Sequence, residues 1–374
     1  MTEMSNYFLE DTSMKTLFVG DICPTDITRE GYATGNTAAL FSDTVTLFNE
    51  SEFTFANLEC AITDSDGAIK KYGPNLKAPV KTAKVLADLK ITVAGLSNNH
   101  VFDFGRKGAL DTIDALTKAG VDYTGFGNDY EDSRRNYVFE KDGEKICVIA
   151  VCEHEYSYAL DDRMGSRPFD EFETLEDIRE AKKTADRVIV AYHGGKELCE
   201  YPSPRLMRAC RAMARAGADL ILTQHSHCIG TYENYNGSHI LYGQGNFNFV
   251  GLYKEEMWKT GLAVKYDTKA NAVEFVPICV TDDGIRLAND DEKADIMAKF
   301  ADRSATIENG KWRDGWHKFC VDNIVNYTDR VKYAHRDEAT ERDNGMFAHY
   351  LDCEAHTDVW RELFPTYNQT NEKD

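Results

Sequence analysis

Five short apolar runs of the chain each end in a loop that carries side chains able to bind a metal ion. The apolar runs are residues 16–19, 53–56, 92–97, 187–192 and 219–222. The side chains that follow them are, in chain order, Asp21, Glu59, Asn99 with His100, His193, and His225 with His227. Each motif alone is weak, but five in the same position relative to a strand indicate one common site.

This combination of carboxylate, amide and imidazole groups suits a centre with two divalent metal ions. Such a centre needs one carboxylate that bridges the two cations against their repulsion, and further His, Asp or Asn ligands for each ion. It also keeps a position open for a water molecule, which the ions make acidic enough to attack as hydroxide. Oxygen and imidazole ligands suit Mn, Fe or Zn alike, and the sequence does not choose among these metals.

The ligands must be positioned by strands and helices that alternate along the chain. Residues 37–48, 82–89, 107–119, 175–185 and 205–216 have helical spacing of apolar residues, and apolar strand-like runs lie between them. Alternation of this kind predicts an α/β fold with a largely parallel sheet, whose strand ends converge at one edge. The polar, charged residues 284–374 predict a helical extension packed on a core domain of residues 1–283.

The composition indicates which classes of partner are disfavoured and which cellular compartment is expected. The chain has 374 residues with a formal net charge of −20 and 42% hydrophobic residues. Such a charge disfavours nucleic acid and anionic membranes as partners. No apolar run approaches the roughly 18 residues of a membrane span, and residues 1–15 lack the pattern of a secretory signal. Ten cysteines without a C-x-x-C pair indicate a reduced, cytoplasmic protein, and the oligomeric state is not indicated.

Six ordered motifs extend the metal-binding pattern. They are Gly20-Asp21, Asn57-Leu58-Glu59, residues 97–100 with Asp103-Phe104-Gly105, His193-Gly194-Gly195 with Glu197, residues 218–221 with 224–227, and residues 242–247. Together they resemble the bacterial CapA-like capsule-synthesis proteins, relatives of poly-γ-glutamate synthesis within the calcineurin-like metallophosphoesterases. The resemblance spans roughly residues 16–280, and it implies a metallophosphatase-like layered α/β sandwich.

The resemblance also implies a role for each metal-binding residue. The implied ligands are Asp21, Glu59, Asn99, His193, His225 and His227. Asp21 and His227 would belong to the first metal, and Glu59 stands at the position of the bridging carboxylate, where Asp is more common. The other three would hold the second metal.

The remaining candidates are one catalytic residue and four residues for substrate. By resemblance His100 is the non-ligand that acts as general acid or stabilises charge in the transition state. His154, Lys196, Glu197 and Asn246 are weaker candidates for contact with substrate. His154 fits a solvated charged loop equally well, and close backbone packing explains the glycines before Asn246 as well as ligand approach does.

Two positions depart from the pattern of the superfamily. Cys23 stands where a histidine is usual, and Gln224 stands where a glycine is usual before the paired histidines. A first metal site with Cys23 is expected to be weaker, thiolate-assisted or empty. The simpler interpretation of Cys23 is a small buried hydrophobic residue.

The function implied by the resemblance is metal-dependent hydrolysis. Hydroxide held by the metals would attack a phosphoester or a γ-glutamyl or other amide-type bond, in a small-molecule or oligomeric anionic substrate. The biological role would lie in capsule or poly-γ-glutamate metabolism. The alternative, motivated by Cys23 and Gln224, is a catalytically degenerate protein that binds or assembles components of capsule polymer synthesis.

Overall fold

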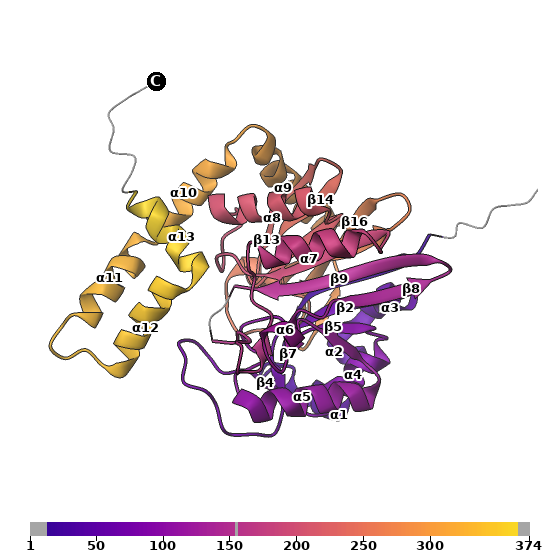
Figure 1. Cartoon of the computed structure of the whole chain (residues 1–374), viewed down its shortest axis with the longest axis horizontal. Helices are drawn as coiled ribbons and strands as arrows, with labels where there is room; N and C mark the ends of the chain where they lie inside the picture. Colours follow the sequence, from indigo (N-terminus) through magenta and orange to yellow (C-terminus); the bar gives the residue numbers. More distant parts are fainter. Residues whose placement is uncertain (1–12, 154–155, 366–374) are drawn as a thin grey trace, which may run out of the picture.

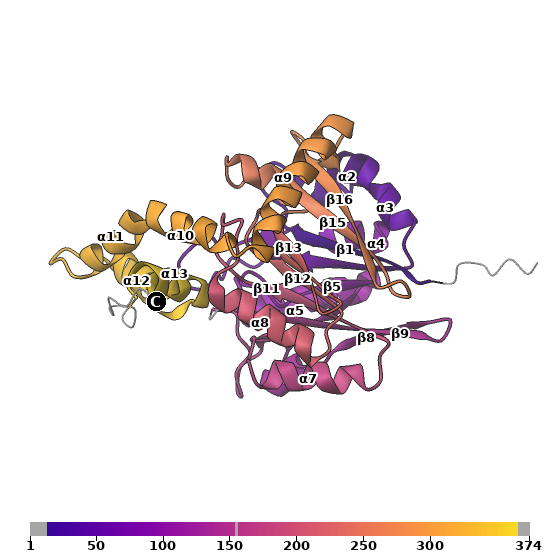
Figure 2. The same ribbon diagram turned by 90° about the horizontal axis from the view of Figure 1, so that it is seen from above.

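Two β-sheets lie face to face at the centre of the computed structural model, which describes residues 13–153 and 156–365 (Figures 1 and 2). Within these residues, the first sheet has seven strands in the order β17-β16-β15-β1-β2-β5-β6. The second has six strands in the order β13-β14-β12-β11-β9-β8. Helices cover the outer face of each sheet, so the molecule has four layers (Figure 2).

The first sheet is parallel on one side and antiparallel on the other. Its parallel strands are β1 (Lys15–Ile22), β2 (Phe53–Leu58), β5 (Val93–Gly95) and β6 (Asp122–Thr124). Its antiparallel strands are β15 (Thr260–Asp267), β16 (Ala272–Val280) and β17 (Ile285–Leu287). The helices on its outer face are α1 (Arg29–Thr34), α2 (Thr37–Phe41), α3 (Val45–Asn49), α4 (Thr82–Asp88) and α5 (Gly105–Ala119).

The second sheet is parallel at its centre and antiparallel at both edges. The parallel strands are β9 (Glu144–Cys152), β11 (Arg187–His193), β12 (Leu220–Gln224) and β14 (Ser238–Gln244). The edge strands are β8 (Tyr137–Lys141) and β13 (Ile229–Tyr235), and the outer face carries α7 (Glu173–Lys182) and α8 (Pro204–Ala216). Short elements complete this part: β3 (Ala61–Ile62) with β4 (Lys77–Ala78), β7 (Phe126–Gly127) with β10 (Gly165–Ser166), α6 (Tyr130–Ser133), η1 (Ser42–Thr44) and η2 (Glu256–Lys259).

The strands are apolar throughout because both of their faces are buried. In β1, Phe18 packs with Val148 and Leu222 of the second sheet, in the layer between the sheets. Its neighbours Leu17 and Val19 point the other way, into the core beneath the helices. Alternate residues of one strand therefore fill two different cores, as the period of two in a strand requires. The arrangement confirms the predicted α/β class and the layered sandwich.

The predicted helical extension is also confirmed. Its helices are α9 (Asp290–Glu308), α10 (Trp312–Asp322), α11 (Ile324–Ala334), α12 (Glu341–Asp352) and α13 (Glu354–Leu363). Helix α9 packs on β13, while α10 to α13 project to one side of the sandwich (Figure 1). Strand β17 still belongs to the first sheet, although it lies beyond residue 283. The division of the chain at that residue stays a prediction.

One helix differs from its sequence-based expectation. Instead of a single helix over residues 37–48, the chain forms α2 and α3, separated by η1. The break occurs at Ser42, whose φ of 42° is incompatible with a continuous right-handed helix. No helix within the described residues combines the length and the apolar composition that crossing a bilayer requires.

Candidate metal centre

The predicted ligands converge at the carboxyl ends of parallel strands from both sheets. Asp21 lies at the end of β1, Glu59 directly after β2, and Asn99 in the loop after β5. From the second sheet, His193 ends β11, and His225 and His227 follow β12. Because the two sheets face each other with these ends at the same edge, residues far apart in sequence form one buried cluster.

Glycine allows the two sheets to approach each other closely at this cluster. A Cβ atom on Gly20 would lie 2.4 Å from the carbonyl oxygen of Gly245, which no side chain tolerates. The close approach lets Asp21 pair with Asn246 in an isolated parallel bridge. The glycines of these two motifs therefore serve backbone packing, and that packing places Asp21 beside the loops of the second sheet.

Glu59 lies at the centre of the cluster. Its side chain is fully buried, and neither carboxylate oxygen has a hydrogen-bond partner among the described residues. Its Oε1 lies 3.4 Å from His193 Nε2 and 3.9 Å from His227 Nε2. Burial, and secondarily the charge of Asp21, raises the pKa of Glu59 well above its ordinary value. A buried carboxylate without hydrogen bonds is costly, and bound cations would offset that cost.

Two groups of possible ligands share this glutamate. Asp21, Glu59 and His193 form one, and Glu59, His225 and His227 form the other; in each group the ligand atoms lie within 4.8 Å of one another. Glu59 thus has the place that a bridging carboxylate needs, and the donor set fits two divalent cations. His227 Nδ1 also lies 3.5 Å from Asp21 Oδ2, so which ligand serves which ion stays a prediction.

Hydrogen bonds hold Asp21 in place. Its Oδ1 accepts a bond of 2.7 Å from the Asn57 side chain, and its Oδ2 accepts one of 3.1 Å from the His225 backbone. Burial raises the pKa of Asp21, and the charge of His227 opposes this shift. Asn57 Nδ2 also lies 3.1 Å from His193 Nδ1. Asn57 belongs to the motif Asn57-Leu58-Glu59, but it was not among the predicted site residues.

Asn99 and the paired histidines complete the cluster. Asn99 Oδ1 lies 2.9 Å from His193 Nε2. His225 and His227 have φ angles of 82° and 53°, in the left-handed region that few side chains adopt. Backbone strain of this kind costs on the order of 1–3 kcal/mol per residue and concentrates at functional sites. Both imidazoles belong to the group of possible ligands that includes Glu59.

Asn246 contacts a histidine of the cluster. Its Oδ1 lies 2.8 Å from His227 Nδ1, and its Nδ2 donates to the Trp258 carbonyl at 3.2 Å. The His227 ring packs 4.2 Å from the Trp258 ring, measured between centroids. These contacts fix the orientation of the imidazole, as partners of metal-bound histidines commonly do. A contact between Asn246 and substrate stays a prediction.

His100 borders the cluster without belonging to either ligand group. Its Nε2 lies 4.0 Å from Glu59 Oε1, and its Nδ1 lies 2.7 Å from Asp103 Oδ2. Asp103 in turn forms a buried ion pair with Lys71, whose Nζ lies 3.1 Å from His100 Nδ1. Burial, and secondarily Lys71, lowers the pKa of His100, so the imidazole is neutral near pH 7. Asp103 was part of the motif of residues 97–105, but no role was predicted for it, and Lys71 was not identified from the sequence.

Three other candidates belong to neither group of possible ligands. His154 falls outside the described residues. Lys196 is half-buried in the loop after β11. Glu197, on the same loop, lies 3.9 Å from His225 Nε2 through its Oε1. A contact between these residues and substrate stays a prediction.

Cys23 and Gln224 have structural roles. The Cys23 thiol is buried in the core against Cys60, and it belongs to neither group of possible ligands. Burial raises the pKa of Cys23 well above its ordinary value, which disfavours the thiolate that a metal would need. Gln224 is buried, and its Nε2 donates to Gln244 Oε1 at 3.2 Å. These contacts favour the interpretation of Cys23 as a small buried hydrophobic residue.

A buried charged network joins the loop after His193 to the helical extension. Glu153 Oε1 accepts a hydrogen bond from the Gly195 backbone, and its Oε2 lies 2.7 Å from Arg205 Nη2. The Nε of the same guanidinium lies 2.9 Å from Asp358 Oδ2, on α13. Arg205 therefore links two acidic groups, one beside the cluster and one in the extension.

Comparison with known proteins relates this architecture to a family. The family described as bacterial capsule synthesis protein PGA_cap matches residues 15–250. The chain is 30% identical over 280 residues to the PGA biosynthesis protein CapA of Bacillus subtilis (strain 168), covering 72% of each chain. It is 28% identical over 282 residues to the capsule biosynthesis protein CapA of Bacillus anthracis, covering 72% of this chain and 67% of that protein.

A solved structure shows a weaker likeness. A hypothetical protein from Thermus thermophilus has 14% sequence identity and a TM-score of 0.44, with coverage of 71% of this chain and 98% of its own. That likeness is too low to support an inference about function. The family match, in contrast, spans every strand that positions the cluster except the antiparallel strands β15 to β17. The chain belongs to the bacterial capsule synthesis protein family PGA_cap.

Proposed function

We propose that this chain is a metal-dependent hydrolase whose buried cluster holds two divalent cations. The proposed ligands are Asp21, Glu59, Asn99, His193, His225 and His227. The observation that carries the proposal is Glu59, which is fully buried without a hydrogen bond from the described residues and is shared by both groups of possible ligands. A cluster built only for stability would be expected to satisfy this carboxylate with hydrogen-bond donors.

The residues around the cations have separate tasks. Two bound cations would make a water molecule acidic and polarise the bond to be cleaved. Asp103 accepts the Nδ1 proton of His100 and thereby leaves Nε2, on the side of Glu59, to take up and return a proton. Burial, and secondarily the charge of Lys71, lowers the pKa of His100 and so favours its neutral form. His100 is accordingly the proposed catalytic residue beside the metals.

The proposed substrate is anionic and carries a phosphoester or a γ-glutamyl amide bond. The relatives named for PGA and capsule biosynthesis support the second chemistry, and the ligand set supports either. The net charge of −20 opposes the approach of an anion, so the cations would supply the local positive charge that binds it. The proposed role is in capsule or poly-γ-glutamate metabolism.

Metal content per chain tests the binding of cations. We expect two transition-metal ions in the wild-type protein purified without chelator, and a clear loss in His225→Ala. The matched control is His239→Ala, because His239 is a buried histidine at the opposite end of β14, bound to Tyr232 and Asn271. Absence of metal in the wild type after addition of manganese or zinc would contradict the proposal.

Activity at full metal loading separates the possible reactions. The metal-loaded protein would be incubated with phosphoester substrates and, separately, with γ-linked glutamate oligomers. Cleavage of one class that is lost in His225→Ala and retained in His239→Ala identifies the bond. A protein that holds both ions but cleaves neither class would instead support the binding or assembly role in capsule polymer synthesis.

A further inference from the structure

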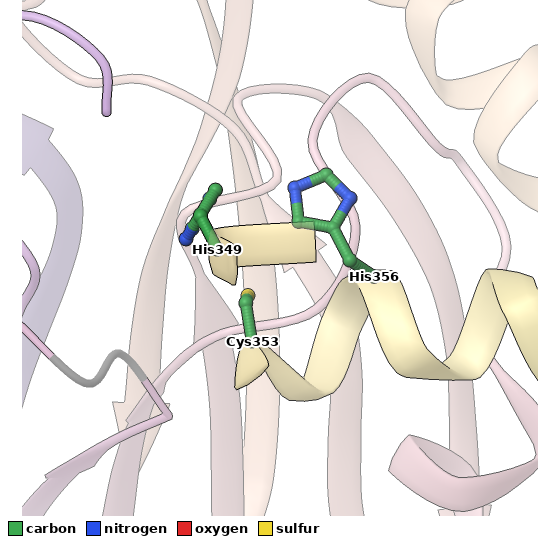
Figure 3. Close-up of side chains that lie close together, drawn as sticks. All are labelled: His349, Cys353 and His356. Carbon is green, nitrogen blue, oxygen red and sulfur yellow. The ribbon is translucent and has the colours of Figure 1, made fainter. Parts of the chain in front are cut away.

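A second group of metal-type side chains lies in the helical extension. His349 is on α12, Cys353 lies between α12 and α13, and His356 is on α13. Their ligand atoms lie within 4.8 Å of one another; His349 is half-buried and the other two are buried. Figure 3 shows the Cys353 sulfur pointing toward the side on which His349 and His356 lie. None of the six proposed ligands of the first cluster belongs to this group.

Local backbone geometry brings the three side chains together. Helix α12 ends at Asp352, and the Cys353 amide donates to the His349 carbonyl at 2.9 Å. Cys353 itself has an extended backbone, with φ of −67° and ψ of 124°, before α13 begins at Glu354. The spacing of four and then three residues would place the side chains on one face of a continuous helix. The bend at Cys353 turns this face into a concave corner between two helices.

The donor set is that of a zinc-class ion. Two imidazoles and one thiolate suit Zn²⁺ and Co²⁺, whereas Mg²⁺ and Ca²⁺ prefer oxygen ligands. Bond lengths of about 2.0–2.3 Å place tetrahedral ligand atoms about 3.3–3.8 Å apart. The ligand atoms here lie within 4.8 Å of one another, so side-chain rotations that bring them closer together would reach that geometry.

The surroundings of His356 fit a metal-bound imidazole. The Tyr327 hydroxyl lies 2.7 Å from His356 Nδ1, and the Tyr350 ring stacks on the imidazole with centroids 3.8 Å apart. Metal-bound histidines commonly use their second nitrogen in such a hydrogen bond, which fixes the ring and directs the other nitrogen to the ion. Aromatic packing alone would explain the stacked ring, but it would not require a thiol and a second imidazole at the same point.

We propose that His349, Cys353 and His356 bind one zinc-class divalent ion, separate from the dinuclear cluster, with a solvent molecule completing the coordination. The ion would fix α12 against α13, and through Tyr327 also α11. Rings of Tyr72 and Tyr156 pack on His349, at centroid distances of 5.6 Å and 5.5 Å. Tyr72 follows Lys71, which contacts His100, so the ion would also hold the extension against a loop of the first cluster.

Cobalt substitution tests the proposal directly. A thiolate bound to Co²⁺ gives a strong charge-transfer absorption band in the near ultraviolet, and the proposed ligands of the dinuclear cluster include no cysteine. We expect this band in the full-length cobalt-loaded protein. In Cys353→Ala the band should disappear and cobalt content should fall by one ion per chain, while circular dichroism shows unchanged helix content.

Matched variants keep the outcome interpretable. Cys320→Ala removes another buried thiol of the extension, and Cys23→Ala removes a buried thiol in the neighbourhood of Glu59; both should retain the band. His349→Ala, at a half-buried position, should weaken cobalt binding at this site at least tenfold without unfolding the helices. His225→Ala should lose cobalt from the first cluster and keep the band.

Three results would overturn the proposal. One is a wild-type protein that shows no charge-transfer band at saturating cobalt. Another is a band that survives in folded Cys353→Ala. The third is a band that disappears in Cys23→Ala, which would assign the thiolate to the first cluster. Because the band reports only a cysteine ligand, failure of the proposed hydrolase activity would leave this test unaffected.

Discussion

Glu59 places an ionisable carboxylate in the interior of the protein, with no hydrogen bond from the described residues. The neighbouring Asp21 adds a second negative charge, although it does receive hydrogen bonds. In the absence of cations this pair destabilises the fold, because desolvation and like-charge repulsion act together. The site is therefore expected to reduce stability without metal and to increase it once metal is bound.

Replacement of Glu59 by glutamine tests both the destabilisation of the metal-free protein and the binding of metal. Glu59→Gln keeps the shape of the side chain and removes its charge, so we expect the metal-free protein to gain about 1–3 kcal/mol in free energy of unfolding. Metal content should fall in the same variant. Urea unfolding in the presence of a chelator and elemental analysis measure the two quantities. Glu180→Gln, at an exposed position, should change stability by less than about 0.5 kcal/mol.

The same charge predicts a pH dependence of the metal-free protein. Burial raises the pKa of Glu59 above its ordinary value of 4.5, so the folded state binds this proton more tightly than the unfolded chain does. The stability that protonated Glu59 contributes is therefore lost as the pH rises from the ordinary pKa of glutamate through the raised pKa of the folded state. Urea midpoints with chelator should fall with pH across that range, and less steeply in Glu59→Gln. An identical slope in both proteins would contradict the expectation.

His100 differs from the ligands in the effect that its removal should have. We expect His100→Ala to retain the full metal content and to lose about 10²–10⁴-fold in kcat, because proton transfer at Nε2 is lost while the ligands stay. Metal analysis and steady-state kinetics on the substrate identified for the wild type check both parts. A variant that retains the full rate would contradict the proposed catalytic role.

At the scale of elements, the strands that end at proposed ligands could be predicted from the sequence, whereas the edge strand β13 could not. Residues 146–152 of β9 are continuously apolar because both faces of this strand are buried. The edge strand β13 (Ile229–Tyr235) mixes polar and apolar residues and was missed, since it pairs with another strand, β14, on one side alone among the described residues. The hydrophobic pattern also could not show that the buried strands form two sheets. A strand that is buried on both faces has the same apolar pattern whether the strands form one sheet or two.

The candidate site was predictable to a similar degree. The proposed ligands lie at or shortly after the ends of strands, so each could be found from the end of an apolar run. Neighbours such as Asn57, which contacts Asp21, and Lys71, which contacts Asp103, act through contacts between segments distant in sequence. Lys71 lies in a loop whose sequence carries no strand or helix pattern, and only the fold brings it to His100.

Gly20 tests how closely the two sheets must approach each other. Gly20→Ala places a Cβ atom 2.4 Å from the Gly245 carbonyl oxygen, so the strands must separate. We expect a loss of about 1–3 kcal/mol in stability and a lower metal content. Gly345→Ala is the control, because a Cβ there meets nothing within 4 Å in α12 and should be neutral or stabilising by about 0.5–1 kcal/mol. Thermal unfolding compares the two, and equal effects would contradict the expectation.

At the scale of the whole molecule, the charged network of Arg205 joins the sandwich to its extension. The side chains of Glu153 and Asp358 are only 1% and 5% exposed, so each depends on the guanidinium between them. The extension also contacts the loop that carries Lys71, since the Tyr72 and Tyr350 rings lie 6.3 Å apart. The position of the extension and the geometry around His100 are therefore connected.

Removal of the guanidinium should release the extension. Arg205→Ala removes the cation that lies between two buried carboxylates, which typically costs about 3–5 kcal/mol, and we expect protease to cleave within α10 to α13 sooner than in the wild type. Arg211→Ala is the control on the same helix, because its pair with Glu233 is 31% exposed on the arginine side and should contribute about 0–1 kcal/mol. Equal rates of cleavage in the two variants would show that the network does not hold the extension.

Because all ten cysteines are buried, thiol modification can measure local opening of the structure around each one. Cys320 and Cys353 lie in the extension, whereas Cys147 and Cys210 lie beneath the helices of the second sheet. A buried thiol reacts with an alkylating reagent only while its surroundings are open, so its rate of modification gives the free energy of that local opening. The sequence thus contains cysteine probes in both parts of the molecule. Release of the extension alone would raise the alkylation rates of Cys320 and Cys353 and leave those of Cys147 and Cys210 unchanged.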